Sequence, residues 1–504
     1  MRDYIGELKG MTREYQLLNE SSAILAWDQE TYIPPAALPE RGEQLALLQS
    51  LAHKKLTSPR VGELLAACGC SDDAPWGSAG ADTRDGAYLR ELYRAYTRQI
   101  RIPSTLVEAI ARATSAGQAA WAEARGKNDF ALFKPYLEKV LSLVVEKAQA
   151  VGYQDHPYDA LLDEYEPWMT TSEISRVFSG LESSLKGLAS RISERPQVDD
   201  AFLYQSFSLE KQRKFARQIV KELGFDFSGG RIDETAHPFT TTLGARDVRI
   251  TGRFREEYFG TGLFGLIHET GHALYEQGFD EEITGNILAT GTSLGIHESQ
   301  SRTWENVVGR SRAFWEHYLP LAREYFPSQF KDVGLDTFYR GINRVSPTHI
   351  RIDADEVTYG LHIILRFRLE LALVRGDLKV DDLTGAWREA SRDLLGIEPE
   401  TSAEGELQDI HWSMGAIGYF PTYALGNLYG AQFWAAFENT VHDTDTLIRN
   451  GDFPVLRNWL RDSIHRHGAS KTAGELCREV SGEDLKPDFL QDYLENKYRG
   501  IYGF

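Results

Sequence analysis

Apolar residues recur every three or four positions along most of the chain, with arginine, lysine and glutamate between them. This spacing gathers the apolar side chains on one face of a helix, so it predicts amphipathic helices. Proline and glycine separate these segments, and no internal repeat or long flexible linker interrupts the pattern. The clearest predicted helices are residues 40–56, 105–126, 135–152, 209–224 and 361–376.

Residues 237–254 follow a different pattern, because threonine and other β-branched residues alternate with polar ones there. The alternation favours strands, and the stretch Leu243–Arg246 has the composition of a turn. We therefore expect a β-hairpin. An edge strand of such a hairpin can hold an extended peptide through main-chain hydrogen bonds.

Directly after the hairpin, residues 262–278 predict a further helix that carries His268, Glu269 and His272. Side chains four residues apart lie on one helical face, so both imidazoles can reach the same metal ion. Glu269, one step around the helix, would lie against the metal's water as a general base, the H-E-x-x-H arrangement of metallopeptidases. The sequence thus predicts a zinc site, although cobalt or manganese also suits these ligands.

A catalytic zinc takes three protein ligands, so a third residue is needed. Residues 291–308 open another helix and contain two candidates, Glu298 and His297. Glu298 is preferred because two histidines and one glutamate form a common catalytic zinc ligand set. His297 is the alternative ligand, and if Glu298 binds the metal, His297 lies behind the ligands or faces the substrate.

The composition limits the kinds of molecule that the protein is expected to bind. With 55 basic and 74 acidic residues the formal net charge is −19, which argues against nucleic acid and anionic membranes. Three cysteines, at positions 68, 70 and 477, form no disulfide framework and indicate a reducing compartment. The first residues are polar, and no apolar run approaches the ~20 residues that cross a bilayer. The cytoplasm is therefore the expected location.

Several motifs accompany H-E-T-G-H and H-E-S-Q along the chain. They are His237-Pro238-Phe239, Asp247-x-Arg249-x-Thr251, Ile350-Arg351-x-x-Ala354-Asp355 and Gly405-x-x-Gln408-Asp409-x-His411-Trp412. In this order they resemble the carboxypeptidase Taq family of metallocarboxypeptidases, over essentially the whole chain. Two residues depart from the family pattern, Tyr32 in place of a methionine and Trp168 in place of a common glycine. Both departures are expected to affect local packing only.

The resemblance implies a mainly α-helical fold similar to neurolysin and angiotensin-converting enzyme. Two helical lobes would flank a long central groove, with a small β-sheet beside the H-E-x-x-H helix. We expect one domain over residues 1–504: helices over about 1–230, the hairpin and metal-binding core over about 231–430, and C-terminal helices over about 431–504. Family members are usually homodimers, so the resemblance also implies a homodimer.

The same resemblance implies an enzyme that releases single C-terminal amino acids from peptides with broad specificity. It has to recognise a free carboxylate, for which a planar guanidinium is well suited. Arg351 and Arg249 are the candidates, and Arg351 is preferred because Arg249 can pair with Asp247 within the hairpin. The alternative is an oligopeptidase that cuts peptides internally, and a non-catalytic peptide-binding helical protein is a third hypothesis.

The tetrahedral intermediate of peptide hydrolysis needs hydrogen-bond donors for its oxyanion. The chain after the last motif offers His411, Tyr419 and Tyr423. His411 and Tyr423 are twelve residues apart, similar to the donors of neurolysin-like enzymes, so Tyr423 is preferred over Tyr419. His237 is expected to shape the groove or contact substrate, and Asp409 to orient a metal-ligating histidine.

Overall fold

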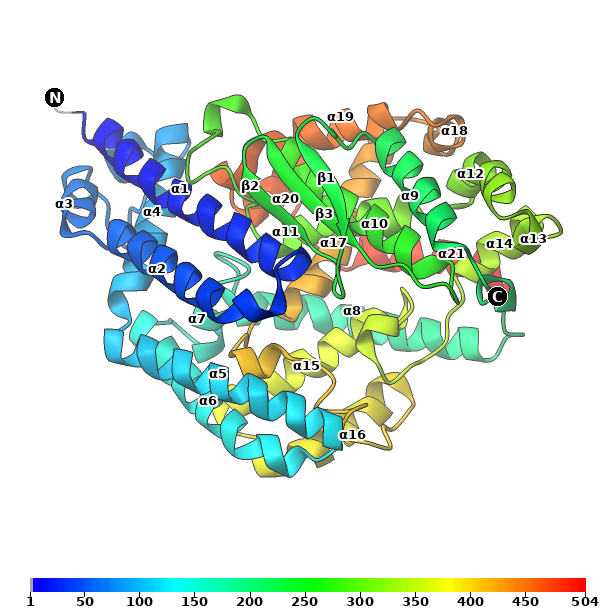
Figure 1. The fold of residues 1–504 in the computed structure, drawn as a ribbon, viewed down its shortest axis with the longest axis horizontal. Helices are drawn as coiled ribbons and strands as arrows, with labels where there is room; N and C mark the ends of the chain where they lie inside the picture. The colour runs from blue at the N-terminus through cyan, green and yellow to red at the C-terminus, as the bar shows by residue number, and fades with distance from the viewer. Residues whose placement is uncertain (1–2) are drawn as a thin grey trace.

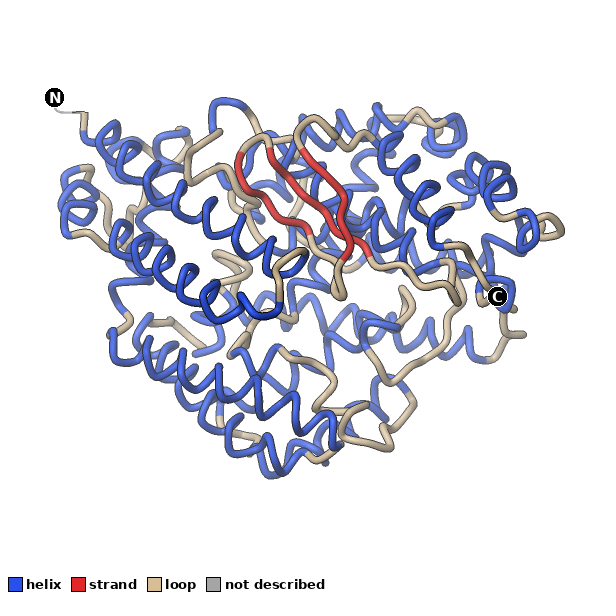
Figure 2. The backbone as a smooth tube through the Cα atoms, in the orientation of Figure 1, coloured by secondary structure: helices blue, strands red, loops and turns tan. Residues whose placement is uncertain are grey.

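The computed structural model describes residues 3–504, which fold mainly into α-helices around one small sheet (Figures 1 and 2). The predicted helices correspond to α2 (Leu38–Leu56), α5 (Ser104–Lys127), α6 (Phe130–Val151), α9 (Leu209–Leu223) and α15 (Thr358–Arg375). The predicted fold class, mainly α-helical with a small sheet beside the H-E-x-x-H helix, is confirmed. In this part of the chain no helix is long and apolar enough to span a membrane.

The other helices complete the layers around the sheet and below it (Figure 1). Those of the first half are α1 (Tyr4–Thr31), α3 (Pro59–Ala67), α4 (Arg84–Arg101), α7 (Pro157–Leu162), α8 (Thr171–Ser193) and α10 (Gly260–Gln277). Those of the second half are α11 (Leu294–Arg302), α12 (Arg312–Tyr325), α13 (Pro327–Phe330), α14 (Leu335–Ile342), α16 (Leu383–Leu395), α17 (Pro421–Thr440), α18 (Thr444–Asn450), α19 (Phe453–Ser463), α20 (Ala473–Ser481) and α21 (Asp488–Tyr502).

The sheet has three strands in the order β1-β3-β2 (red in Figure 2). β2 (Thr240–Gly244) and β3 (Asp247–Gly252) form the predicted antiparallel hairpin, which places β2 at an edge. β1 (Gly230–Glu234) pairs with β3 in parallel and was not predicted. Its five residues include only one buried side chain, Asp233, so no apolar alternation marks it in the sequence.

Two apolar cores hold the helices together. The larger one runs from α5 and α6 through α8 and α15 to α10, α17 and α21. A smaller one joins α1, α3 and α4 to the segment after α10, through Leu8, Leu64, Leu89 and Leu288. The first helices therefore pack as a separate apolar cluster beside the sheet, where α1 contacts β2.

Trp168 has a left-handed backbone with φ of 70°, which explains why a glycine is common at this position in the family pattern. A left-handed conformation costs an L-residue roughly 1–2 kcal/mol, and Trp168 is 45% exposed, so the buried half of its indole offsets this cost. The Trp168→Gly variant is therefore expected to unfold with a free energy about 1 kcal/mol higher than that of Trp168→Ala, measured by denaturant titration.

Trp168→Ala is the matched control, because alanine removes the same indole but keeps the Cβ that causes the strain. It should leave the unfolding midpoint unchanged or lower it. Equal stability of the two variants would show that the left-handed backbone of this position is not a source of strain.

Candidate active site

Helices α10 and α11 cross closely, and this crossing brings the predicted metal ligands together. The approach depends on Gly271 in α10, where a Cβ would lie 2.5 Å from the carbonyl oxygen of Gln300. Gly426 in α17 leaves room from the other side, since a Cβ there would lie 2.4 Å from Cγ of Glu298. The glycine of H-E-T-G-H therefore lets α11 approach the two histidines.

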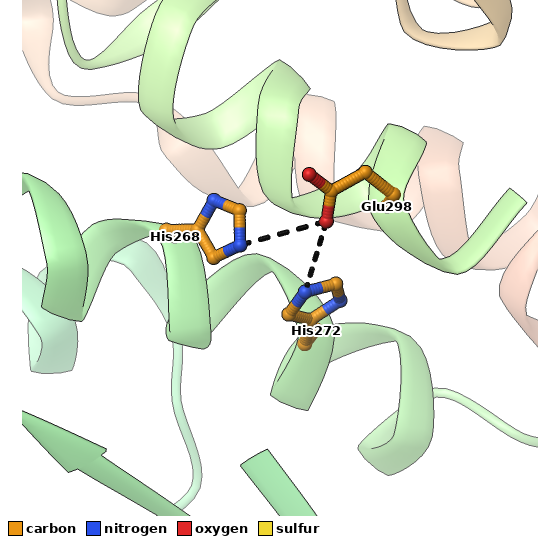
Figure 3. A group of neighbouring side chains, drawn as sticks. All are labelled: His268, His272 and Glu298. Carbon is orange, nitrogen blue, oxygen red and sulfur yellow. Dashed lines mark ion pairs between the residues drawn. The ribbon is translucent and has the colours of Figure 1, made fainter. Parts of the chain in front are cut away.

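His268, His272 and Glu298 point toward one another from the two helices (Figure 3). Oε2 of Glu298 is 3.5 Å from Nε2 of His268 and 3.4 Å from Nε2 of His272. Bonds of about 2.0–2.1 Å to a tetrahedral zinc would separate two ligand atoms by about 3.3 Å. The spacing and the two-imidazole, one-carboxylate donor set fit a divalent cation.

The protonation states of two of the three ligands suit a cation directly. Burial acts to lower the pKa of His268, but Glu298 and Glu305 raise it, so this imidazole loses a proton when a cation binds. Burial lowers the pKa of His272 to about 3, so its ring is neutral, as a metal ligand must be. Burial acts to raise the pKa of Glu298, but Arg302 and His268 hold it well below its usual range. Nε of Arg302 donates to Oε1 of Glu298 at 2.7 Å, which leaves Oε2 facing the imidazoles.

Both ligand imidazoles are fixed from behind through Nδ1. Nδ1 of His268 lies 2.9 Å from Oε2 of Glu305, and Nδ1 of His272 lies 3.0 Å from the carbonyl oxygen of His297. Such contacts select the tautomer that presents Nε2 to a metal. The prediction that Asp409 orients a ligand histidine is wrong, because Glu305 and a backbone carbonyl do so.

The role of Glu305 was not predicted, although its spacing from Glu298 in the sequence could have indicated it. It lies seven residues after Glu298, two helical turns further along the same face. α11 continues directly into a π-helix, Thr303–Val308, which carries this second carboxylate. Arg302 and Arg310 each lie 3.3 Å from a Glu305 oxygen, so the carboxylate is tied on several sides.

His297 lies behind His272 and not at a corner of the triangle. Its Nδ1 is 2.6 Å from Nδ1 of His272, and its Nε2 is 2.8 Å from Oε1 of Glu276. Its side chain borders a cavity of about 520 Å³ between α1, β2 and α10. Of the two candidates for the third ligand, the structure brings Glu298 to the histidines.

Glu269 is 7% exposed and is fastened to the edge strand. Oγ1 of Thr240 in β2 lies 2.6 Å from Oε2 of Glu269 and 3.0 Å from its carbonyl oxygen. Burial raises the pKa of Glu269, which brings the carboxylate closer to the range where it can both accept and return a proton. The strand thus holds the predicted base in place.

Arg351 is 6% exposed and is held by a carboxylate. Its Nη2 and Nε donate to Oδ1 of Asp409 at 2.8 and 3.1 Å, and Nη1 donates to the hydroxyl of Tyr359 at 3.2 Å. Arg366 in α15 donates to the other oxygen of Asp409 at 2.7 Å. Two guanidinium groups share one carboxylate, so this cluster carries a net positive charge.

The positive cluster is joined to the metal-ligand triangle. The guanidinium of Arg302, which holds Glu298, lies 4.6 Å from the ring centre of Tyr359, which holds Arg351. A cavity of about 320 Å³ borders Arg302, Glu305 and Tyr359 on this side. Cavities therefore lie next to the groups that surround the triangle, one beside β2 and one beside Arg302 and Glu305.

Arg249 and His237 lie on the sheet side. Arg249 makes a paired contact with Asp247 at 2.8 and 2.7 Å, as predicted for the hairpin. Its guanidinium also stacks 4.3 Å from the ring centre of Trp27. His237 is exposed in the loop between β1 and β2, and its carbonyl accepts a hydrogen bond from Thr235. Its contact with substrate stays a prediction.

The candidate oxyanion donors lie together beside Arg351. The hydroxyl of Tyr423 is 3.5 Å from Nε2 of His411, and its ring centre is 5.0 Å from the Arg351 guanidinium. The Tyr419 ring packs against Tyr423, with ring centres 5.4 Å apart. Burial raises the pKa of both tyrosines, so both hydroxyls keep the proton that a donor needs.

A family model described as carboxypeptidase Taq (M32) metallopeptidase matches residues 7–498. The chain belongs to the carboxypeptidase Taq (M32) family. Its M32 relatives include Thermostable carboxypeptidase 1 of Thermus thermophilus, 43% identical over 97% of each chain. Carboxypeptidase 1 of Bacillus subtilis is 39% identical over 99% of each chain.

The solved M32 carboxypeptidase of Deinococcus radiodurans has the same fold, with a TM-score of 0.95 at 38% identity. The match covers 99% of this chain and all of that one. An M32 metallopeptidase requires a divalent metal, and the triangle of His268, His272 and Glu298 supplies a ligand set for it. The relatives are named carboxypeptidases, so they favour that activity over internal cleavage.

Proposed function

We propose that this M32 protein is a metal-dependent carboxypeptidase that releases single C-terminal amino acids from peptides. The observation that carries this proposal is the contact between Arg302 and Tyr359, which joins the metal-ligand triangle to the positive Arg351 cluster. In this proposal the terminal carboxylate of a peptide binds at Arg351 and its last peptide bond lies at the triangle. The free C-terminus is then the feature that selects the bond.

His268, His272 and Glu298 would hold the metal, with zinc as the proposed ion. A divalent ion there would act as a Lewis acid and make water a stronger nucleophile near neutral pH. Glu305, Arg302 and the carbonyl of His297 keep the ligand atoms turned inward. The ligands are thus set before a metal arrives, which reduces the reorganisation that binding requires.

Glu269 would be the general base. It takes a proton from the attacking water as the water oxygen bonds to the carbonyl carbon, and it returns this proton to the amine nitrogen as the C–N bond breaks. The products are a shortened peptide and one free amino acid. Thr240 keeps the Glu269 carboxylate oriented, because its hydroxyl lies 2.6 Å from Oε2 of Glu269.

Arg351 would bind the terminal carboxylate, and His411 with Tyr423 would donate to the oxyanion. We prefer Tyr423 over Tyr419 because its hydroxyl lies next to Nε2 of His411.

Both candidate arginines are paired with a carboxylate. Arg351 shares Asp409 with Arg366 and so keeps a net positive charge, whereas Asp247 alone neutralises Arg249. Arg249 is therefore a weaker candidate for the substrate carboxylate.

Location and assembly form part of the same proposal. Cys68, Cys70 and Cys477 are all free thiols, which supports a reducing compartment such as the cytoplasm. The larger apolar core takes residues from all three predicted parts of the chain, which supports a single domain. The homodimer rests on the family resemblance alone.

Removal of the metal is expected to abolish activity while leaving the fold in place. Both apolar cores are built from residues other than the three ligands, so circular dichroism should change little when a chelator takes the ion. Readdition of zinc or cobalt to the dialysed protein should restore release of the last residue from an N-blocked dipeptide, followed by mass spectrometry. Full activity in metal-free protein would contradict the proposal.

A further inference from the structure

Glu370 in α15 is a fully buried acid that the proposed mechanism does not use. Its carboxylate accepts three hydrogen bonds, from the hydroxyl of Tyr158 at 2.6 Å, the indole nitrogen of Trp412 at 2.8 Å and the backbone N–H of Gly418 at 3.1 Å. Within residues 3–504 no lysine or arginine forms an ion pair with it, and Arg366, one turn earlier, binds Asp409 instead. Burial of a carboxylate without a cationic partner costs folding free energy, so the presence of Glu370 at this position requires an explanation.

Two of the three donors mark the ends of one short segment. Trp412 directly follows His411, and Gly418 directly precedes Tyr419. The segment starts as a 3-10 helix, His411–Met414, and turns back before α17, which carries Tyr423. One carboxylate therefore fastens both ends of the loop that presents His411.

The imidazole of His411 is held mainly by packing. Among the described residues, its Nδ1 has no hydrogen-bond partner, and the nearest Asp409 oxygen is 3.9 Å away. Its ring packs against Phe420 and Tyr419, with ring centres 4.6 and 5.2 Å apart. The packing of neighbouring residues in the loop therefore fixes the position of the His411 imidazole. Glu370 in turn fixes the position of this loop through its hydrogen bonds.

We propose that Glu370 is a positioning residue, which holds the segment from His411 to Tyr419 so that His411 and Tyr423 meet the oxyanion together. The inference rests on the proposed function, in which these two side chains are the donors. Burial raises the pKa of Glu370 to about 7, and the three donors favour the ionised form that can accept from all of them.

Glu370→Gln tests this with almost no change in shape. An amide accepts through one oxygen only, so its NH₂ group must face either Trp412 or Gly418, and one end of the loop is released. Because an oxyanion donor acts mainly in the transition state, kcat should fall about 10- to 100-fold while KM changes less than about twofold.

Tyr158→Phe is the matched control. It removes the third donor to the same carboxylate but leaves both contacts to the loop, so kcat should stay within about twofold of the parent. A loss in this variant equal to that of Glu370→Gln would show that general core disruption is responsible, and would overturn the inference.

The deciding measurement is a double-mutant cycle with Tyr423→Phe. If Glu370 acts by aligning the donor pair, Glu370→Gln should cost much less than its own 10- to 100-fold once the tyrosine hydroxyl is gone. Full multiplication of the two losses, or a parent-like kcat in folded Glu370→Gln, would overturn the inference. A parent-like kcat for Tyr423→Phe alone would instead refute the donor role in the proposed function, and the inference with it.

If Glu370→Gln does not fold, Trp412→Phe replaces it in the cycle, because it deletes the indole donor to Glu370 and keeps an aromatic ring, with a smaller volume, at this buried position. The expected result is a smaller loss of kcat in the same direction, again reduced in the Tyr423→Phe background. An unchanged kcat in Trp412→Phe would overturn the inference.

Discussion

Glu269→Gln is expected to lower kcat by about 1,000-fold without loss of bound metal, since general acid–base groups contribute about 10²–10⁴-fold. The amide can still accept from Thr240, so its position is kept, but it has no basic oxygen for the proton of the attacking water. His268, His272 and Glu298 are untouched, which is why the metal content should remain that of the parent. The measurement combines steady-state kinetics on an N-blocked dipeptide with metal analysis of the purified variant.

Glu281→Gln is the control for Glu269→Gln, because it makes the same substitution at an exposed position whose ion-pair partner is Arg246. Its kcat should equal that of the parent. A Glu269→Gln variant that keeps its metal and more than about a tenth of the parent kcat would contradict the role of Glu269 as the base.

Arg351→Lys is expected to lower kcat/KM on peptides with a free C-terminus by about 100-fold. A lysine keeps the positive charge but cannot form the paired contacts of a guanidinium with a carboxylate. It would also leave Asp409 with fewer donors, although Arg366 still holds one oxygen of that carboxylate. The loss of a buried, charged hydrogen bond costs about 3 kcal/mol, which corresponds to roughly 100-fold.

Arg249→Lys is the matched comparison, since it makes the same change at the other candidate arginine. Arg249 pairs with Asp247 and stacks on Trp27, so the substitution should loosen the packing of α1 on the sheet and change kcat/KM by less than about fivefold. A larger loss in Arg249→Lys than in Arg351→Lys would transfer the carboxylate anchor to Arg249.

The sequence was sufficient for the parts of the site that depend on short-range helix geometry. His268 and His272 lie four residues apart on one helix, so their common face follows from the helical repeat alone. The hairpin was equally local, because its alternation and its turn lie within residues 237–254. The choice of Glu298 over His297 needed chemistry as well as spacing, and the crossing of α10 and α11 brings Glu298 to the histidines.

The contacts that the sequence did not reveal join segments far apart in the chain. Asp409 lies 58 residues after Arg351 and 43 after Arg366, and no local pattern indicates that it binds both. β1 was missed because a short polar strand gains its stability from its neighbour β3 and not from its own alternation. Long-range pairing of this kind depends on the whole fold.

The most direct test of the central claim uses two N-blocked peptides that differ only at the C-terminus, one a free acid and the other an amide. Incubated with the metal-loaded enzyme and followed by mass spectrometry, the free acid should lose its last residue and the amide should resist, because only the acid can bind Arg351. Cleavage of the amide at the same rate, or internal cleavage of both peptides, would contradict the account.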